Sequence, residues 1–236
     1  MHRQVRWLAG PAGSLGLWRI AQVASALEAL LIQLRAQPKK ITSSVIRTVA
    51  QAIDTLASLF DQAANPQIEG MTSPKILIVD DEIISRETIC SALGKASLSA
   101  TSLDDSVAAQ QLLEKKQFDL IFLDLDMPGK SGLDLCVNIR EMATNRDTPV
   151  VFVTSHSDFL SRAQSTLSGG SDFIAKPFLS VELAVKALSW LFREPFQPLS
   201  VAKPVGPADD NRDRAPTFEA AHALAGSPGA SSKAPF

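Results

Sequence analysis

Short apolar segments alternate with amphipathic segments between residues 75 and 191. The apolar segments are Lys75–Val79, Leu98–Thr101, Phe118–Leu123, Val150–Val153 and Phe173–Ala175. Helical spacing of apolar residues follows each of them, near Ser85–Leu93, Asp104–Glu114, Gly132–Met142, Phe159–Leu167 and Ser180–Leu191. Strands that alternate with helices form right-handed βαβ units. The pattern therefore predicts an α/β domain whose five-stranded parallel sheet is covered by helices on both faces.

Polar side chains stand where the predicted strands end. Asp80 and Asp81 follow the first strand, Asp124 the third, Thr154 the fourth and Lys176 the fifth. Open α/β sheets bind ligands in the crevice at the carboxyl ends of their strands. We expect the three carboxylates to lie within a few ångströms of one another, which like charges tolerate only beside a cation. Oxygen ligands favour a hard ion, and Mg²⁺ is the predicted cofactor.

The remaining two groups suit a phosphoryl group beside that ion. The Lys176 ammonium and the Thr154 hydroxyl can bond its equatorial oxygens. A carboxylate nucleophile next to Mg²⁺ is the arrangement that forms an aspartyl phosphate. The sequence therefore indicates phosphoryl chemistry at Asp124.

In order and spacing, these elements resemble the receiver domain of two-component response regulators over residues 75–191. The resemblance implies a flavodoxin-like fold with strand order 2-1-3-4-5. It implies that Asp124 is the phosphoacceptor and that Lys176 and Thr154 contact the phosphoryl group. It further implies metal binding by Asp80, Asp81, Asp124 and the backbone carbonyl of Asp126, a switch formed by Thr154 and Phe173, and a cis peptide bond before Pro177.

Each of these residues alone has a simpler explanation. The Asp80–Asp81 pair suits a helix N-cap, and Asp124 and Asp126 suit a turn with Pro128 and Gly129. Lys176 alone would be a solvated charge, Phe173 a core residue, and Thr154 alone indicates almost nothing. An Asp-x-Asp pair also occurs in haloacid-dehalogenase-type phosphatases, but there it ends the first strand. The agreement of all elements in order favours the receiver.

The predicted function is that of a response regulator, a signalling domain that phosphorylates itself from a donor and is not a conventional enzyme. The expected donor is a sensor histidine kinase or a histidine phosphotransfer (Hpt) protein, and the output is contact with a downstream protein that the sequence does not name. One alternative is a phosphorelay intermediate that passes the phosphoryl group on to an Hpt partner. Another is a scaffold that docks through the N-terminal helices.

Residues 1–70 predict a separate helical region. Two amphipathic helices, near Leu17–Arg35 and Thr42–Gln62, are separated by Pro38 and suit an antiparallel hairpin. The apolar stripe of the second consists of Val45, Ile46, Val49, Ile53, Leu56, Leu59 and Phe60. If this stripe is left uncovered, we expect a homodimer.

The segment before these helices resembles the Hpt motif. Leu8, Gly10, Ala12, Gly13 and Gly16 match it, whereas Arg6 occupies the position of the phosphorylated histidine. Arginine cannot carry a phosphoryl group in this chemistry, and the family's preceding helix has no counterpart after Met1. We therefore expect a degenerate, truncated Hpt-like region that serves docking or dimerisation. An unrelated helical hairpin is the alternative.

Residues 194–236 hold seven of the fourteen prolines and few large apolar residues, which predicts a disordered tail after a receiver domain at 72–193. His222 has an Hpt-like His-x-Leu-x-Gly context there, but Pro228 interrupts it. No helix-turn-helix or zinc pattern is visible in this tail.

Composition narrows the expected partners and location. The formal net charge of −2 argues against nucleic acid and anionic membranes as partners. Cys90 and Cys136 lie in apolar periodic segments and are expected to be reduced and buried. The apolar window Leu17–Leu34 contains Arg19 and Glu28, so it does not suit a membrane span. We expect a soluble, cytoplasmic protein.

Overall fold

The structure is a computed structural model that describes residues 10, 12–14, 16–63, 73–155 and 168–193. The tail at 194–236, the helix predicted near Phe159–Leu167, the Arg6 and Leu8 positions of the Hpt-like motif and the linker near Met71 lie outside the described residues. Among the described residues, no helix is both long and apolar enough to cross a lipid bilayer.

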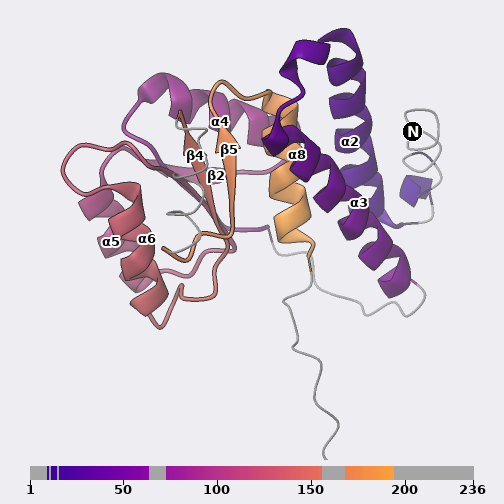
Figure 1. The fold of residues 1–236 in the computed structure, drawn as a ribbon. Coiled ribbons are helices and arrows are strands. Elements are labelled where there is room, and N and C mark those ends of the chain that lie inside the picture. The colour runs from indigo at the N-terminus through magenta and orange to yellow at the C-terminus, as the bar shows by residue number, and fades with distance from the viewer. Residues whose placement is uncertain (1–9, 11, 15, 64–72, 156–167, 194–236) are drawn as a thin grey trace, which may run out of the picture. The chain divides into compact units, whose positions relative to one another are not determined.

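The sheet has the predicted topology. Its strands are parallel, lie in the order β2-β1-β3-β4-β5, and span Ile76–Val79 (β1), Ala100–Leu103 (β2), Leu120–Asp124 (β3), Val150–Thr154 (β4) and Asp172–Ala175 (β5) (Figure 1). Every residue of the three central strands β1, β3 and β4 is buried. Their apolar runs are therefore those of strands covered on both faces. The flavodoxin-like fold is confirmed.

Helices cover both faces of this sheet. They are α4 (Ile83–Lys95), α5 (Ser106–Lys115), α6 (Gly132–Glu141) and α8 (Ser180–Leu191). One hydrophobic cluster joins a sheet face to residues of α5 and α6, and a second joins the opposite face to α4 and α8. Asp105 and Ser131 cap α5 and α6 by accepting bonds from the backbone N–H groups of Ala108 and Asp134.

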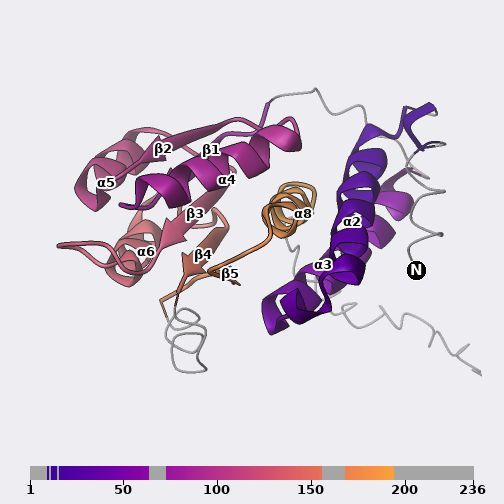
Figure 2. The same ribbon diagram turned by 90° about the horizontal axis from the view of Figure 1, so that it is seen from above.

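The predicted N-terminal hairpin is also present. It consists of α2 (Trp18–Ala36), a short 3₁₀ turn (Pro38–Lys40) and α3 (Ser43–Ala63). Both helices pack against α8, and the described residues of the hairpin and of the sheet domain belong to one compact unit. Figure 2 shows α8 between the sheet and the hairpin. This position explains why α8 is buried around most of its circumference, including Glu182 and Lys186.

The predicted apolar stripe of α3 is only half correct. Leu56 and Leu59 are buried as expected, but Ile46, Ile53 and Phe60 are 61%, 40% and 42% exposed. The helix also turns hydroxyl side chains toward α8, where Ser44 donates to Glu182 and Thr55 to the Ser189 carbonyl. The buried polar members of this face are Ser44, Thr48 and Thr55. Homodimerisation through the exposed stripe stays a prediction, which light scattering can test.

The two cysteines differ in burial. Both are free thiols, but Cys136 is buried whereas Cys90 is only partly buried. The prediction that Cys90 is buried was therefore wrong. Cys90 packs at the margin of the cluster between α4 and the sheet. Burial raises the pKa of the Cys136 thiol to about 11, so it stays protonated near neutral pH.

Candidate functional site

The last residue of β3 is a buried carboxylate. Asp124 is 5% exposed, and its Oδ1 accepts a 2.9 Å hydrogen bond from the backbone N–H of Leu125. Gly129, with φ at +81°, adopts a left-handed conformation in the turn that follows. Burial raises the pKa of Asp124 against the opposing attraction of Lys176. The group is therefore held at an energetic cost, which is characteristic of functional sites.

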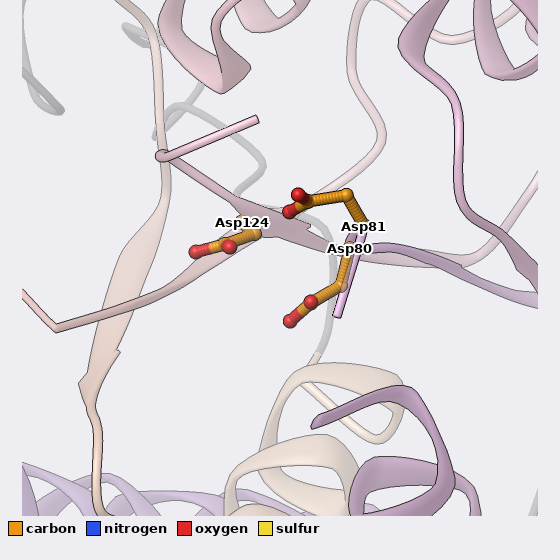
Figure 3. A group of neighbouring side chains, drawn as sticks. All are labelled: Asp80, Asp81 and Asp124. Carbon is orange, nitrogen blue, oxygen red and sulfur yellow. The ribbon is translucent and has the colours of Figure 1, made fainter. Parts of the chain in front are cut away.

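Two further carboxylates stand at the end of the neighbouring strand β1. Ligand oxygens of Asp80, Asp81 and Asp124 all lie within 4.8 Å of one another (Figure 3). Asp80 is 1% exposed, whereas Asp81 is exposed to solvent. The carboxylates that the sequence assigned to strand ends thus lie together at the carboxyl edge of the sheet.

A single ammonium group bridges two of these carboxylates. Lys176 Nζ lies 2.9 Å from Asp80 Oδ2 and 3.3 Å from Asp124 Oδ2, and it also approaches Glu82 Oε2 at 3.9 Å. Burial lowers the pKa of Lys176, but hydrogen bonds and charge attraction from Asp80 and Asp124 outweigh it, so the net pKa is raised. Lys176 therefore remains charged and offsets part of the negative charge.

The other predicted residues are placed by the sheet register. Thr154 is the last residue of β4, is 2% exposed, and directly follows Val153, which pairs with Asp124. Phe173 on β5 is 6% exposed and belongs to the core cluster rather than to the group of carboxylates. The Lys176–Pro177 peptide bond is cis, as the resemblance implies. Asp126 is exposed in the loop after β3, outside the group of three carboxylates.

Three residues that sequence reasoning missed support the site. Ser85 donates its hydroxyl to Asp80 Oδ2, and Arg86 Nη1 donates to the backbone carbonyls of Asp80 and Asp81 at 2.7 and 3.0 Å. Gly132 begins α6 directly against the carbonyl of Asp124, where a Cβ atom would come well inside 3.0 Å. For Ser85 and Arg86, the only signal in the sequence is their position in the first turn of the helix that follows Asp80 and Asp81.

The donor set fits a hard divalent cation. Three carboxylate oxygens converge, and one ammonium leaves their charge only partly compensated. Both oxygens of Asp80 already accept hydrogen bonds, from the Glu82 backbone N–H and from Ser85 and Lys176. The exposed Asp81 carboxylate has no hydrogen bond to any described residue. The exposed Asp81 carboxylate is thus the most accessible direct ligand, whereas the Asp124 oxygens, like those of Asp80, already contact other groups. Carboxylate oxygens of this kind suit Mg²⁺.

Comparison with known proteins agrees with this geometry. Residues 76–188 match the family model of the response regulator receiver domain. The aerobic respiration control protein ArcA of Escherichia coli K12 is 31% identical over 123 residues, 52% of this chain and 50% of ArcA. The phosphate regulon transcriptional regulatory protein PhoB of the same strain is 32% identical over 112 residues, 48% of this chain and 49% of PhoB.

A solved structure also matches. A candidate response regulator from Chloroflexus aurantiacus J-10-fl is 26% identical, with a TM-score of 0.50, and the match covers 52% of this chain and 100% of that one. The chain spans about half the length of the curated relatives it matches. These matches leave the Hpt-like resemblance of residues 1–70 a prediction, since the family model begins at residue 76. Residues 76–188, about half of the chain, thus match the receiver domain of response regulators.

Proposed function

We propose that the chain is a response regulator that accepts a phosphoryl group on Asp124 from a phosphohistidine donor. One observation carries the proposal: a buried carboxylate at the end of the central strand lies close to two further carboxylates and to a lysine ammonium. An isolated carboxylate at this depth would be costly, and this one is surrounded by groups that can bind a metal and an anion.

The chemistry is a transfer between two covalent carriers. An Asp124 carboxylate oxygen attacks phosphorus, and the P–N bond to the donor imidazole breaks with its electron pair going to nitrogen. A phosphohistidine that is protonated on its other ring nitrogen then leaves as neutral imidazole. The product is an acyl phosphate on Asp124. Asp81 and Asp124 would hold Mg²⁺, with Asp80 acting through water, and the ion would supply positive charge for the phosphoryl oxygens.

Lys176 and Thr154 position the transferred group. The Lys176 ammonium, already 3.3 Å from Asp124 Oδ2, can turn to a phosphoryl oxygen while Ser85 keeps Asp80 bonded. The Thr154 hydroxyl at the end of β4 bonds another phosphoryl oxygen. Its movement gives Phe173 on β5 room to follow, and this biases the surface of β5 and α8 between two arrangements.

The signal leaves the receiver through protein contact. A sensor histidine kinase or an Hpt protein supplies the phosphoryl group, and a downstream protein reads the change. The two arrangements of β5 and α8, and of the elements that pack on them, are the structural basis for this output.

Intact mass spectrometry tests the proposal directly. The full chain is incubated with acetyl phosphate and Mg²⁺, beside an Asp124→Asn variant whose fold is checked by circular dichroism. A gain of one phosphoryl group in the parent protein alone supports the proposal. A folded parent protein that gains no mass, or a variant that gains as much as the parent, overturns it.

A further inference from the structure

The N-terminal hairpin bonds directly to the strand that carries Phe173. Ser44 Oγ of α3 donates to Glu182 Oε1 of α8 at 2.5 Å and lies 3.4 Å from the backbone carbonyl oxygen of Phe173. Two turns further along α3, the Gln51 side-chain amide donates to Asp172 Oδ2 at 2.7 Å. Contacts between residues 121 to 138 positions apart thus fix α3 against β5 and α8.

These bonds extend a buried network of the receiver itself. Lys186 is fully buried, and its Nζ lies 2.8 Å from Asp172 Oδ2 and 3.2 Å from the Phe173 carbonyl. Buried polar groups are costly unless their bonds are satisfied, so the orientation of α3 is specified by partners on β5 and α8. Apolar packing alone would specify the orientation of α3 less strictly, because it tolerates sliding of one helix along another.

The same helix covers the side chain of Phe173. The Arg47 guanidinium carbon lies 5.1 Å from the centre of the Phe173 ring, and Arg47 Nη1 is 3.4 Å from Asp172 Oδ1. Cations over an aromatic face are attracted by the ring quadrupole. Phe173 is therefore held between the core of the receiver and a residue of the hairpin.

We infer that the hairpin is the element that responds to phosphorylation within the same chain. Its helix α3 occupies the β5–α8 surface, and the contact between Arg47 and Phe173 couples docking of the hairpin to phosphorylation of Asp124. The inference rests on the proposed function, in which Phe173 moves when the phosphoryl group draws Thr154. It adds a partner that residues 76–188 alone do not contain. The surface that would otherwise meet a separate protein is already taken by residues 43–63.

The sign of the coupling follows from the contacts. The described arrangement of β5 is held by three residues of α3, namely Ser44, Arg47 and Gln51. A shift of Phe173 therefore weakens the contacts between α3 and β5. Coupling between two equilibria is reciprocal. Phosphorylation therefore loosens the hairpin, and loosening the hairpin favours phosphorylation.

Hydrogen exchange on the full chain tests the first half of this statement. Beryllofluoride with Mg²⁺ serves as the phosphoryl mimic, beside Mg²⁺ alone and beside the Asp124→Asn variant. Amides of α3 should exchange faster with the mimic in the parent protein and remain unchanged in the variant. If the mimic protects the ends of β1 and β3 but leaves α3 unchanged or slower, the inference falls while the proposed function stands. If the mimic does not bind, the proposed function is wrong, and the inference that rests on it is wrong as well.

A pair of arginine variants tests the second half. Arg47→Ala removes the contact with Phe173, whereas Arg35→Ala removes an equal charge from the exposed end of α2. Half-saturation by beryllofluoride, at fixed Mg²⁺, should need about three- to tenfold less ligand in Arg47→Ala, at the low end of common coupling strengths. Arg35→Ala should match the parent protein. Equal half-saturation of the two variants, with both folded by circular dichroism, overturns the inference.

Discussion

Gly132 lies against the backbone carbonyl of Asp124, so close that a Cβ atom on residue 132 would come well inside 3.0 Å of that oxygen. The N–H of Gly132 also donates to the carbonyl of Leu125 at 3.1 Å. The start of α6 is thus fixed against the chain that carries the candidate phosphoacceptor. A side chain at 132 can be accommodated only if one of these backbones moves.

Gly132→Ala should therefore damage both the fold and the site. We expect a loss of about 1–3 kcal/mol in the free energy of unfolding, typical of overpacking in a close-packed interior. We also expect at least a tenfold lower rate of phosphorylation by acetyl phosphate, since small misplacements of a reacting group are costly. Urea denaturation and timed intact-mass measurements check the two effects.

Gly94 provides a matched control, because a Cβ there meets nothing within 4 Å and its helix position favours alanine. Gly94→Ala should be neutral or stabilising by up to about 1 kcal/mol. Equal free energies of unfolding and equal phosphorylation rates of the two alanine variants would show that the approach of Gly132 to Asp124 affects neither stability nor phosphorylation.

Asp124→Asn should stabilise the metal-free protein. Burial raises the pKa of Asp124, so the ionised carboxylate is disfavoured in the folded state, while Lys176 keeps its partner Asp80 in the variant. Removing the charge should increase the free energy of unfolding by about 1 kcal/mol near neutral pH. Urea denaturation without divalent ions is the measurement.

The pH dependence of that gain has a definite sign. A carboxyl whose pKa is raised on folding contributes stability below its unfolded pKa, and this contribution disappears as pH rises through the folded value. The advantage of Asp124→Asn should thus be small near pH 4 and grow toward about pH 7. The exposed Asp147 offers a control, and Asp147→Asn should show no such growth. An advantage that shrinks with rising pH would contradict the assigned cause.

The fold was predictable because its signals are local. Apolar runs such as Leu120–Leu123 and the polar residues after them specify buried parallel strands and place Asp80 and Asp124 at one edge. The roles of these residues stay predictions that the phosphorylation experiment tests. Gly132 was not predictable, since its importance depends on a tertiary approach between backbones that no spacing reveals.

The hairpin was harder to predict for a related reason. Helical periodicity predicted both helices, but it placed Ile46 and Ile53 on the packing face. The packing face instead uses Ser44, which bonds to Glu182 some 138 positions away. A polar interface of this kind resembles a solvated helix face in the sequence, because its partners come from a distant segment.

Mg²⁺ should stabilise the protein through the exposed carboxylate Asp81. A ligand that binds only the folded state adds RT ln(1 + [L]/Kd) to the free energy of unfolding, about 2.7 kcal/mol at one hundred times Kd. Asp81→Asn should leave the metal-free unfolding temperature unchanged, since the side chain is exposed, and should abolish most of the Mg²⁺-dependent rise. Glu87→Gln, on an exposed position of α4, should keep the full rise. A full rise in Asp81→Asn would remove that residue from the metal site.

The buried pair Lys186–Asp172 should behave as one energetic unit. Both side chains are inaccessible to solvent, and the ammonium lies 2.8 Å from the carboxylate. Burial lowers the pKa of Lys186, and attraction by Asp172 opposes this effect. Removing either partner leaves the other charge buried with fewer bonds, so Lys186→Met and Asp172→Asn should each cost about 2–4 kcal/mol.

The double variant separates charge pairing from packing. Lys186→Met combined with Asp172→Asn removes both charges of this pair together, so its cost should fall below the sum of the single costs by about 1–3 kcal/mol. Lys115→Met, at the exposed end of α5, should change the free energy of unfolding by less than about 0.5 kcal/mol. Urea denaturation followed by circular dichroism gives all four values. Strict additivity of the two single costs would mean that the ammonium and the carboxylate stabilise the fold independently, and the network that fixes α3 against β5 would lose its central bond.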